Sequence, residues 1–232
     1  MKKYIFAIIF ILIISSVYVV YPKNKMQETK EKVNLVTEDG VNLVGSFYLK
    51  DSETAVILVH MLNSNKESYN GLAEILNKDY AVLSFDSRGH GESDLNWNDF
   101  SDEDFNKMVL DIKSAKKFLF EKGYKNIYLI GASIGANTVL NYASSDEEIK
   151  KIVLLSPGLD YRGVSTEESI RNFKGSLLII SSEGGEYSFS SSEKLFSESL
   201  GNKKIIKLEG NKHGTNMLDS DLMDKIKRWL EE

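Results

Sequence analysis

A serine between two glycines is the residue best placed for chemistry in this sequence. Residues 129–140 read LIGASIGANTVL, so Ser133 follows an apolar run and precedes a segment of helical character. Gly131 and Gly135, two residues before and after it, leave room for a sharp turn between a strand and a helix. Such a turn exposes the hydroxyl, and a helix N-terminus favours developing negative charge. The pattern predicts a nucleophile at Ser133, with a turn that has no chemistry as the alternative.

A serine hydroxyl needs a base to become a good nucleophile. The chain has three histidines, and His213 is the one that follows Ser133. It lies in EGNKHGTN, between the last predicted strand and the last predicted helix. In one class of catalytic triad the chain order is serine, acid, histidine. His213 is therefore predicted as the base, with an ordinary surface-loop histidine as the alternative.

The elements that must position these residues are apolar runs separated by helical patterns. The runs are continuous, as in strands covered on both faces, and occupy residues 55–60, 80–86, 126–131, 151–156, 176–181 and 203–208. Helical patterns lie between them at 68–77, 101–119, 134–143, 191–200 and 222–230. Residues 34–49 alternate around Asp39-Gly40, which indicates a hairpin. We therefore expect one α/β domain over residues 33–232, with a doubly wound, mostly parallel sheet, an antiparallel N-terminal hairpin and no large cap domain.

The first 21 residues do not fit this domain. Two lysines precede an uncharged apolar run from Tyr4 to Tyr21, and eighteen helical residues span about 27 Å, close to the thickness of a bilayer core. Residues 1–21 are predicted to be a transmembrane anchor and residues 22–32 a polar tether. A signal peptide that is cleaved to release a secreted protein is the alternative. The domain is expected on the extracytoplasmic side, although the lysines after the run favour the opposite orientation.

Composition narrows the remaining classes of function. A net charge of −5 gives no indication of nucleic-acid binding. The absence of cysteine excludes disulfides, thiol nucleophiles and thiolate metal ligands. Three well-separated histidines form no ligand cluster, so neither a metal nor an organic cofactor is expected. The sequence gives no prediction of oligomeric state.

Two further segments complete a resemblance. VHMLNSNKESY (59–69) is similar to an oxyanion loop, and DSRGHGES (86–93) is similar to a D-x-R-G-x-G-x-S turn. With GASIG and the late histidine, residues 33–230 resemble the α/β-hydrolase fold serine hydrolases, such as esterases and lipases. The resemblance implies that His90 and Arg88 are structural parts of the turn and that His60 shapes the oxyanion loop.

The same resemblance implies the groups that would hold an oxyanion. They are the backbone N–H groups of Met61 and Ile134. Met61 stands where the family commonly has glycine. A backbone donor tolerates that change, although the side chain narrows the space beside it. The alternative for Met61 is a core methionine.

The acid of the triad is where the sequence departs from the family. Aligning the strand at 176–181 and the helix after it places Gly185 where the family carries an aspartate. Glu183 and Glu186 are the nearest carboxylates, and glutamate serves in some triads. Asp160, after the preceding strand, is a third candidate. A site without an acid is the fourth possibility, and an ordinary solvated charge is the alternative for each glutamate.

These residues predict a membrane-anchored serine hydrolase. It is expected to cleave an ester or thioester through an acyl-enzyme on Ser133, with a small acyl ester or a membrane lipid as substrate. The alternative is a non-catalytic hydrolase-fold binding protein tethered to the membrane, for which Gly185 is the main reason.

Deleting residues 1–26 is expected to release the protein from membranes, because the run from Tyr4 to Tyr21 is predicted to lie in the bilayer. Sedimentation of both forms with membranes checks this, and an intact N-terminus recovered from a soluble fraction contradicts the anchor. Protease added to sealed cells should reach the domain. Its protection would reverse the predicted orientation.

Overall fold

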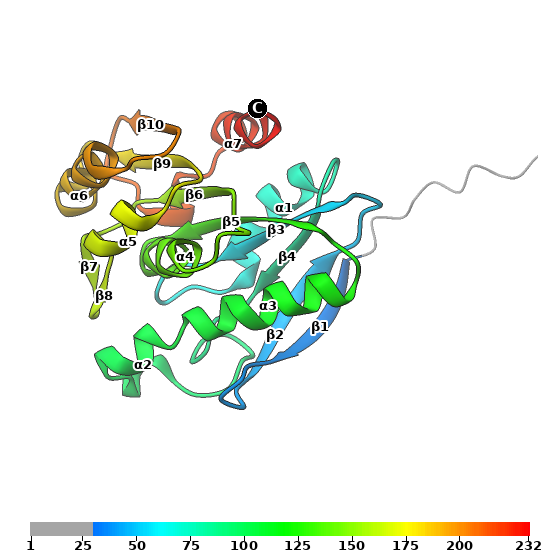
Figure 1. Cartoon of the computed structure of the whole chain (residues 1–232). Helices are drawn as coiled ribbons and strands as arrows, with labels where there is room; N and C mark the ends of the chain where they lie inside the picture. Colours follow the sequence, from blue (N-terminus) through cyan, green and yellow to red (C-terminus); the bar gives the residue numbers. More distant parts are fainter. Residues whose placement is uncertain (1–29) are drawn as a thin grey trace, which may run out of the picture.

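The structure is a computed structural model that describes residues 30–232. Its central sheet has eight strands, which are β1 (Lys30–Val36), β2 (Asn42–Tyr48), β3 (Thr54–Val59), β4 (Ala81–Phe85), β5 (Asn126–Ala132), β6 (Lys151–Leu155), β9 (Ser176–Ser182) and β10 (Lys203–Leu208). They are arranged in the order β1-β2-β4-β3-β5-β6-β9-β10 (Figure 1). The six strands β3, β4, β5, β6, β9 and β10 are parallel, whereas β2 is antiparallel to both β1 and β4. The predicted sheet is confirmed.

Helices cover both faces of this sheet (Figure 1). They are α1 (Asn70–Leu76), α2 (Asp102–Asn106), α3 (Val109–Glu121), α4 (Ile134–Ser144), α5 (Glu167–Asn172), α6 (Glu186–Glu198) and α7 (Ser220–Glu231), with short 3₁₀ turns η1 (Lys66–Tyr69), η2 (Trp97–Asp99) and η3 (Gly214–Met217). One apolar cluster joins the sheet to α3, α4, α5 and α6, and a second joins it to α1 and α7. This is the doubly wound arrangement that the alternating runs predicted.

The central strand β3 shows why the apolar runs are continuous. Side chains alternate between the two faces of a strand. Ala55, Ile57 and Val59 belong to the cluster beneath α3 and α4, whereas Val56 and Leu58 belong to the cluster beneath α1 and α7. All five are at most 1% exposed. Burial of a valine, leucine or isoleucine side chain contributes about 1.5–3 kcal/mol, so both faces favour the strand.

The first strand begins earlier than the predicted tether allows. Lys30 pairs with Tyr48 in the antiparallel ladder, so residues 30–32 belong to β1. The Lys30 ammonium lies 5.4 Å from the centre of the Tyr48 ring and donates to Asn70 Oδ1 at 3.1 Å. The prediction of a tether through residue 32 is therefore wrong for its last three residues. Backbone pairing extends the strand beyond its first buried side chain, Val33.

The helical pattern over 101–119 folds as two helices. Ser101 caps α2 as expected and accepts from the Asp104 N–H. Met108 donates to the carbonyl of Phe105, three residues back, and this tighter turn separates α2 from α3. Phe105 and Met108 pack on Ile134 and Val164 rather than on the sheet. The apolar spacing correctly predicted helical turns over this segment. The segment divides into two helices because α2 packs on Ile134 and Val164, whereas α3 packs on the sheet.

The segment between β6 and β9 also holds more structure than predicted. A two-stranded hairpin, β7 (Asp160–Tyr161) and β8 (Val164–Ser165), is followed by α5. The Asn106 side chain donates to the carbonyl of Gly163 at 3.0 Å, which joins the hairpin to α2. Helix α6 starts at Glu186, five residues before the predicted helix. These small elements leave the prediction of no large cap intact.

The predicted membrane segment, residues 4–21, lies outside the described residues. None of the helices within residues 30–232 combines the length and the apolar character needed to span a bilayer.

Candidate active site

Ser133 forms the sharp turn between β5 and α4. Its backbone has φ 53° and ψ −122°, a left-handed conformation that L residues rarely adopt. The Ser133 N–H donates to the Leu155 carbonyl at 2.8 Å, and the Ser133 carbonyl accepts from Ala136 at 2.8 Å. Strain of this kind persists when the surrounding structure over-determines it, and it clusters at functional sites. The serine is 8% exposed, so the turn presents it at the edge of a buried region.

The two glycines of GASIG are required by close backbone contacts. A Cβ on Gly131 would collide with the carbonyl group of Gly135. A Cβ on Gly135 would lie 2.5 Å from the carbonyl oxygen of His60. The spacing of glycine, serine and glycine therefore lets α4 approach both β5 and the loop after β3. The N–H groups of the first helical turn have no intrahelical partner, and Ile134 supplies the first of them.

The loop after β3 is held by His60, which is 1% exposed. The backbone N–H of Ser87 donates to His60 Nε2 at 3.0 Å, so Nδ1 carries the ring proton and donates to the Met61 carbonyl at 2.8 Å. Burial lowers the pKa of His60 to about 4, which keeps the ring neutral. Both nitrogens are thus occupied in shaping the turn at Met61. His60 has the structural position that the resemblance implied.

The Met61 side chain packs toward the core. It joins the apolar cluster that contains Ala132 and Met217. A Cβ on Gly214 would lie 2.7 Å from Met61 Sδ, so the thioether rests against the loop that carries His213. The core-methionine interpretation therefore describes the side chain, while the backbone N–H is left for the proposed oxyanion role.

His213 immediately precedes η3, and its loop lies beside the Ser133 turn. The next residue, Gly214, lies against Ala132, which precedes Ser133, and a Cβ on it would be 3.5 Å from the Ala132 Cβ. Burial lowers the pKa of His213, so the imidazole is neutral near pH 7 and able to accept a proton. Its ring meets the Tyr161 ring edge to face, with centroids 6.3 Å apart. The fold thus packs the loop of His213 against the residue before Ser133, although the two are eighty positions apart in the chain, and no hydrogen bond joins their side chains within residues 30–232.

Tyr161 contacts both Ser133 and His213. Burial raises its pKa to about 12, and a hydrogen bond with the Ser133 side chain partly offsets that rise. Its hydroxyl donates to the Ser156 carbonyl at 3.4 Å, and its ring packs on Gly158. The phenol is therefore neutral, its one proton is donated to the Ser156 carbonyl, and its oxygen accepts from the Ser133 side chain.

None of the three candidate acids is hydrogen-bonded to His213 within residues 30–232: Glu183 lies in the loop after β9, Glu186 begins α6 and Asp160 begins β7. Glu183 and Glu186 are exposed. The Asp160 carboxylate accepts from the Gly163 N–H at 3.0 Å and so closes the β7–β8 turn. Between residues 30 and 232, no carboxylate is hydrogen-bonded to the His213 ring. The loop of Glu183 does touch the histidine loop, because the Gly184 N–H donates to the Gly210 carbonyl at 2.8 Å.

Comparison with known proteins agrees with this geometry. The sequence model of the alpha/beta hydrolase fold matches residues 54–179, more than half of the chain. The chain belongs to the α/β-hydrolase fold family. A thiohydrolase, AneE of Aspergillus aculeatus, is 29% identical to it over 141 residues, 58% of this chain and 44% of that protein. The chain spans about half the length of its first sequence relatives, 51% and 44%.

Solved structures of similar fold include esterases. The Pyrococcus furiosus esterase Pf2001 superposes with a TM-score of 0.76 at 22% identity, covering 88% of this chain and 92% of that chain. Est1E of Butyrivibrio proteoclasticus, solved with ferulic acid, superposes with a TM-score of 0.73 at 19% identity, covering 85% and 97%. At these identities the likeness concerns the fold.

Gly185 of this α/β-hydrolase is the residue before α6. Its N–H donates to the Ser182 carbonyl at 3.0 Å, and its carbonyl accepts from Phe189 at 2.8 Å. A Cβ there would lie 2.9 Å from Ser188 Oγ and 3.2 Å from the Ser182 oxygen. The glycine therefore starts the helix in a tight turn, and an aspartate would require Ser188 to move.

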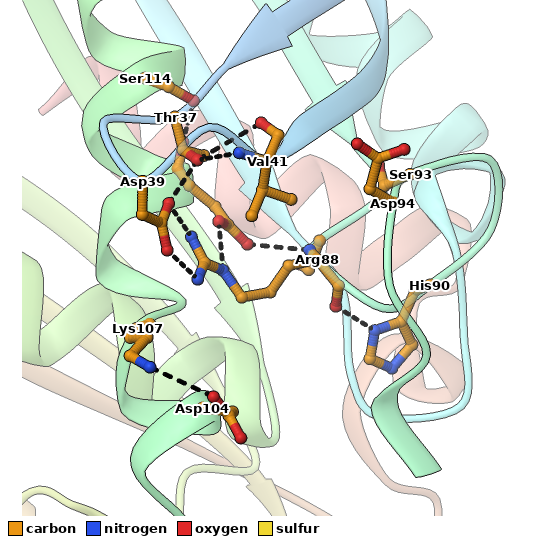
Figure 2. A network of polar contacts seen from close by, with 12 residues as sticks. Thr37, Asp39, Val41, Arg88, His90, Ser93, Asp94, Asp104, Lys107 and Ser114 are labelled. Atoms are coloured by element: carbon orange, nitrogen blue, oxygen red, sulfur yellow. Dashed lines mark hydrogen bonds and ion pairs between the residues drawn. The ribbon is translucent and has the colours of Figure 1, made fainter. Parts of the chain in front are cut away.

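The turn after β4 supports the site through a buried ion pair. Arg88 is 2% exposed and donates through Nε to Asp111 at 2.8 Å. Its two terminal nitrogens reach both oxygens of Asp39 at 2.8 and 3.0 Å, which ties the turn to the N-terminal hairpin (Figure 2). These bonds hold the pKa of Asp39 down to about 2.

His90 belongs to the same turn. Its Nδ1–H donates to the Arg88 carbonyl at 3.0 Å (Figure 2). The ring stacks on Trp97 with centroids 5.8 Å apart, and burial lowers its pKa. Asp86, fully buried beside it, accepts from Lys66 Nζ at 2.7 Å. His90 and Arg88 thus have the structural positions that the resemblance implied.

Sequence reasoning missed Tyr161 and Ser156. Tyr161 precedes Arg162 and Gly163, both with positive φ, in the turn of a short hairpin. A Gly in that turn was the available signal, but arginine is not a typical residue for a positive φ. Ser156 also has a positive φ, 52°, and no sequence pattern indicates it.

Replacing Asp111 by alanine is expected to lower the free energy of unfolding by about 3–5 kcal/mol, because it leaves the Arg88 charge buried with part of its pairing lost. Urea unfolding followed by circular dichroism measures this. Glu53→Ala, which breaks an exposed pair with Lys125, is the control and should cost no more than about 1 kcal/mol. Equal losses in the two variants would contradict the structural weight given to the Arg88 pair.

Proposed function

We propose that this α/β-hydrolase cleaves an ester or thioester through an acyl-enzyme on Ser133. The observation that carries the proposal is the strained turn at Ser133, with the His213 loop packed against the residue before it. Backbone strain at a residue other than glycine clusters at functional sites, and here it coincides with a serine whose neighbour contacts the histidine loop. The esterases of similar fold and the thiohydrolase relative support this class of reaction.

The proposed reaction has two halves. Neutral His213 removes the proton of the Ser133 hydroxyl while the oxygen attacks the carbonyl carbon. The resulting oxyanion receives hydrogen bonds from the backbone N–H groups of Met61 and Ile134. The tetrahedral intermediate collapses, and His213 gives the proton to the leaving alcohol or thiol. Water then attacks the acyl-enzyme with the same base, which releases the acid and restores the serine. No step requires a metal or an organic cofactor.

A carboxylate that orients His213 is a separate part of the proposal. Glu183 and Glu186 are exposed, and neither is hydrogen-bonded to the ring within residues 30–232. Asp160 is already used in the β7–β8 turn. We keep Glu183 and Glu186 as the acids to test first and Asp160 as the third. A site in which none of them acts is the remaining possibility.

The substrate proposal is a small acyl ester or a membrane lipid. The support is an apolar wall beside the nucleophile. Ile134, the residue after Ser133, packs in a cluster of apolar and aromatic side chains, which are Leu62, Trp97, Phe100, Phe105, Met108, Tyr161 and Val164. Four of these side chains, Leu62, Trp97, Phe100 and Tyr161, are only partly buried, and an acyl chain is the part of an ester that they would favour.

Attachment to a membrane through residues 4–21, with the domain on the extracytoplasmic side, remains a proposal from the sequence. Secretion after cleavage is its alternative.

A non-catalytic, membrane-tethered binding protein is the second candidate function. The observation in its favour is Gly185, which has no side chain to orient His213. The strained serine and the nearby neutral histidine favour the enzyme.

Ser133→Ala is expected to abolish both hydrolysis of short acyl esters and labelling by a fluorophosphonate probe, because the attacking oxygen is gone. His213→Ala should also remove most activity, since an unassisted serine hydroxyl is a poor nucleophile. Ser145→Ala, at the exposed opposite end of α4, is the matched control and should keep wild-type rates. Undiminished ester turnover in Ser133→Ala would rule out the assignment.

The acid is identified by comparing ester hydrolysis in Glu183→Gln, Glu186→Gln and Gly185→Asp. Loss of triad support costs about 10⁴ in rate in a serine protease, so a large loss in one glutamine variant identifies the natural acid. Gly185→Asp should then give little gain. No loss in either variant, with a gain of about tenfold in Gly185→Asp, would favour the binding protein. No change in any of the three would direct the search to Asp160. Circular dichroism of Gly185→Asp checks that the displacement of Ser188 has not unfolded the protein.

A further inference from the structure

The orientation of His213 raises a question that the proposed triad leaves open. No carboxylate within residues 30–232 is hydrogen-bonded to the imidazole. The ring nevertheless has two supports, which are the backbone of its loop, packed against Ala132, and the ring of Tyr161. A residue that holds both the His213 loop and Tyr161 in place would therefore determine the position of the imidazole.

Ser156 contacts both the His213 loop and Tyr161. It follows β6 directly, is fully buried, and has a φ of 52°, one of five positive values at non-glycine residues between 30 and 232. Its N–H donates to the Ile180 carbonyl of β9 at 2.8 Å, so the strained turn is anchored in the sheet. A rigid strand end is a better support for a site than a free loop.

The Ser156 hydroxyl is hydrogen-bonded to both ends of the 3₁₀ turn that follows His213. Oγ accepts from the Gly214 N–H at 3.1 Å and donates to Met217 Sδ at 3.6 Å. Gly214 and Met217 are the first and last residues of η3. The hydroxyl thus determines where the turn begins, immediately after the histidine.

The Ser156 carbonyl provides a second connection to His213, through Tyr161. It accepts from the Tyr161 hydroxyl at 3.4 Å, and the Tyr161 ring stands perpendicular to the His213 ring. The same residue therefore supports the backbone on one side of the histidine and the aromatic ring on another.

We propose that Ser156 is a positioning residue for His213, acting through the Gly214 N–H and through Tyr161. The proposal rests on the function proposed above, because it assigns to Ser156 the task of aligning the base with the nucleophile. It does not touch substrate. Its removal should therefore lower kcat and leave KM nearly unchanged, since loss of alignment affects the chemical step.

A buried serine that only fills space would behave differently, and β9 provides the comparison. Ser181 is also 0% exposed, and its hydroxyl has no hydrogen-bond partner among residues 30–232. Ser156→Gly removes the hydroxyl and keeps a backbone that tolerates positive φ, whereas Ser181→Ala removes an equally buried hydroxyl that supports nothing.

The experiment measures ester hydrolysis and the hydrogen exchange of the Gly214 amide in the full-length wild type, Ser156→Gly and Ser181→Ala. We expect Ser156→Gly to lower kcat about tenfold or more with KM within about twofold, and to speed exchange at Gly214 by about tenfold. Ser181→Ala should match the wild type in both. Thermal unfolding of all three separates these effects from a failure to fold.

Wild-type kcat in Ser156→Gly, or an equal loss in Ser181→Ala, overturns the proposal. A rise in KM without a fall in kcat also overturns it. If the wild type hydrolyses no ester and Ser133 does not label, the proposed function fails, and the exchange measurement alone decides. Faster exchange confined to Ser156→Gly then retains the anchoring of the loop, and unchanged exchange refutes it.

Discussion

The close approach of α4 to the ends of β3 and β5 is the constraint on which the site depends. Side chains at Gly131 or Gly135 would collide with backbone carbonyls, so this packing is open only to glycine at both positions. Once the helix is so close, the residue between them must turn sharply, and Ser133 takes a left-handed conformation. The conformational strain is offset by the buried strands and helix on either side. The position of the Ser133 hydroxyl at the edge of a buried region, the position of the Ile134 amide and the nearness of the loop after β3 all follow from this one contact.

Environment rather than residue type separates the three histidines. His60 uses both nitrogens to hold the backbone, and burial keeps it neutral. His90 donates from Nδ1 to its own turn, and its Nε2 is buried without a hydrogen-bond partner among the described residues. His213 is half-buried, and its ring makes no hydrogen bond within residues 30–232. It is therefore the imidazole best able to exchange a proton with a substrate, and proton transfer requires such a free nitrogen.

Support for the site comes from the ends of the parallel strands. β3 leads into the loop of Met61, β4 into the Arg88 turn, β5 into Ser133, β6 into Ser156 and β10 into the His213 loop. Because the carboxyl ends of parallel strands lie at one edge of a sheet, residues distant in sequence become neighbours there. The buried Arg88 pair joins the turn after β4 to Asp39 of the N-terminal hairpin. Gly185 leaves one position in this arrangement without a side chain, and the contacts that the structure gives to the His213 ring and its loop are those of Tyr161 and of the backbone.

The sequence by itself determined the sheet, its antiparallel hairpin and the two elements of the Ser133 turn. Those features depend on local signals, namely continuous apolar runs, helical spacing and glycines at fixed separations. It also placed His213 after the last strand. The break between α2 and α3, the β7–β8 hairpin and the start of β1 at Lys30 were decided by contacts with distant parts of the chain. Tyr161 and Ser156 belong to this second group. Their roles arise from hydrogen bonds and ring contacts with residues up to 61 positions away, which no local pattern encodes.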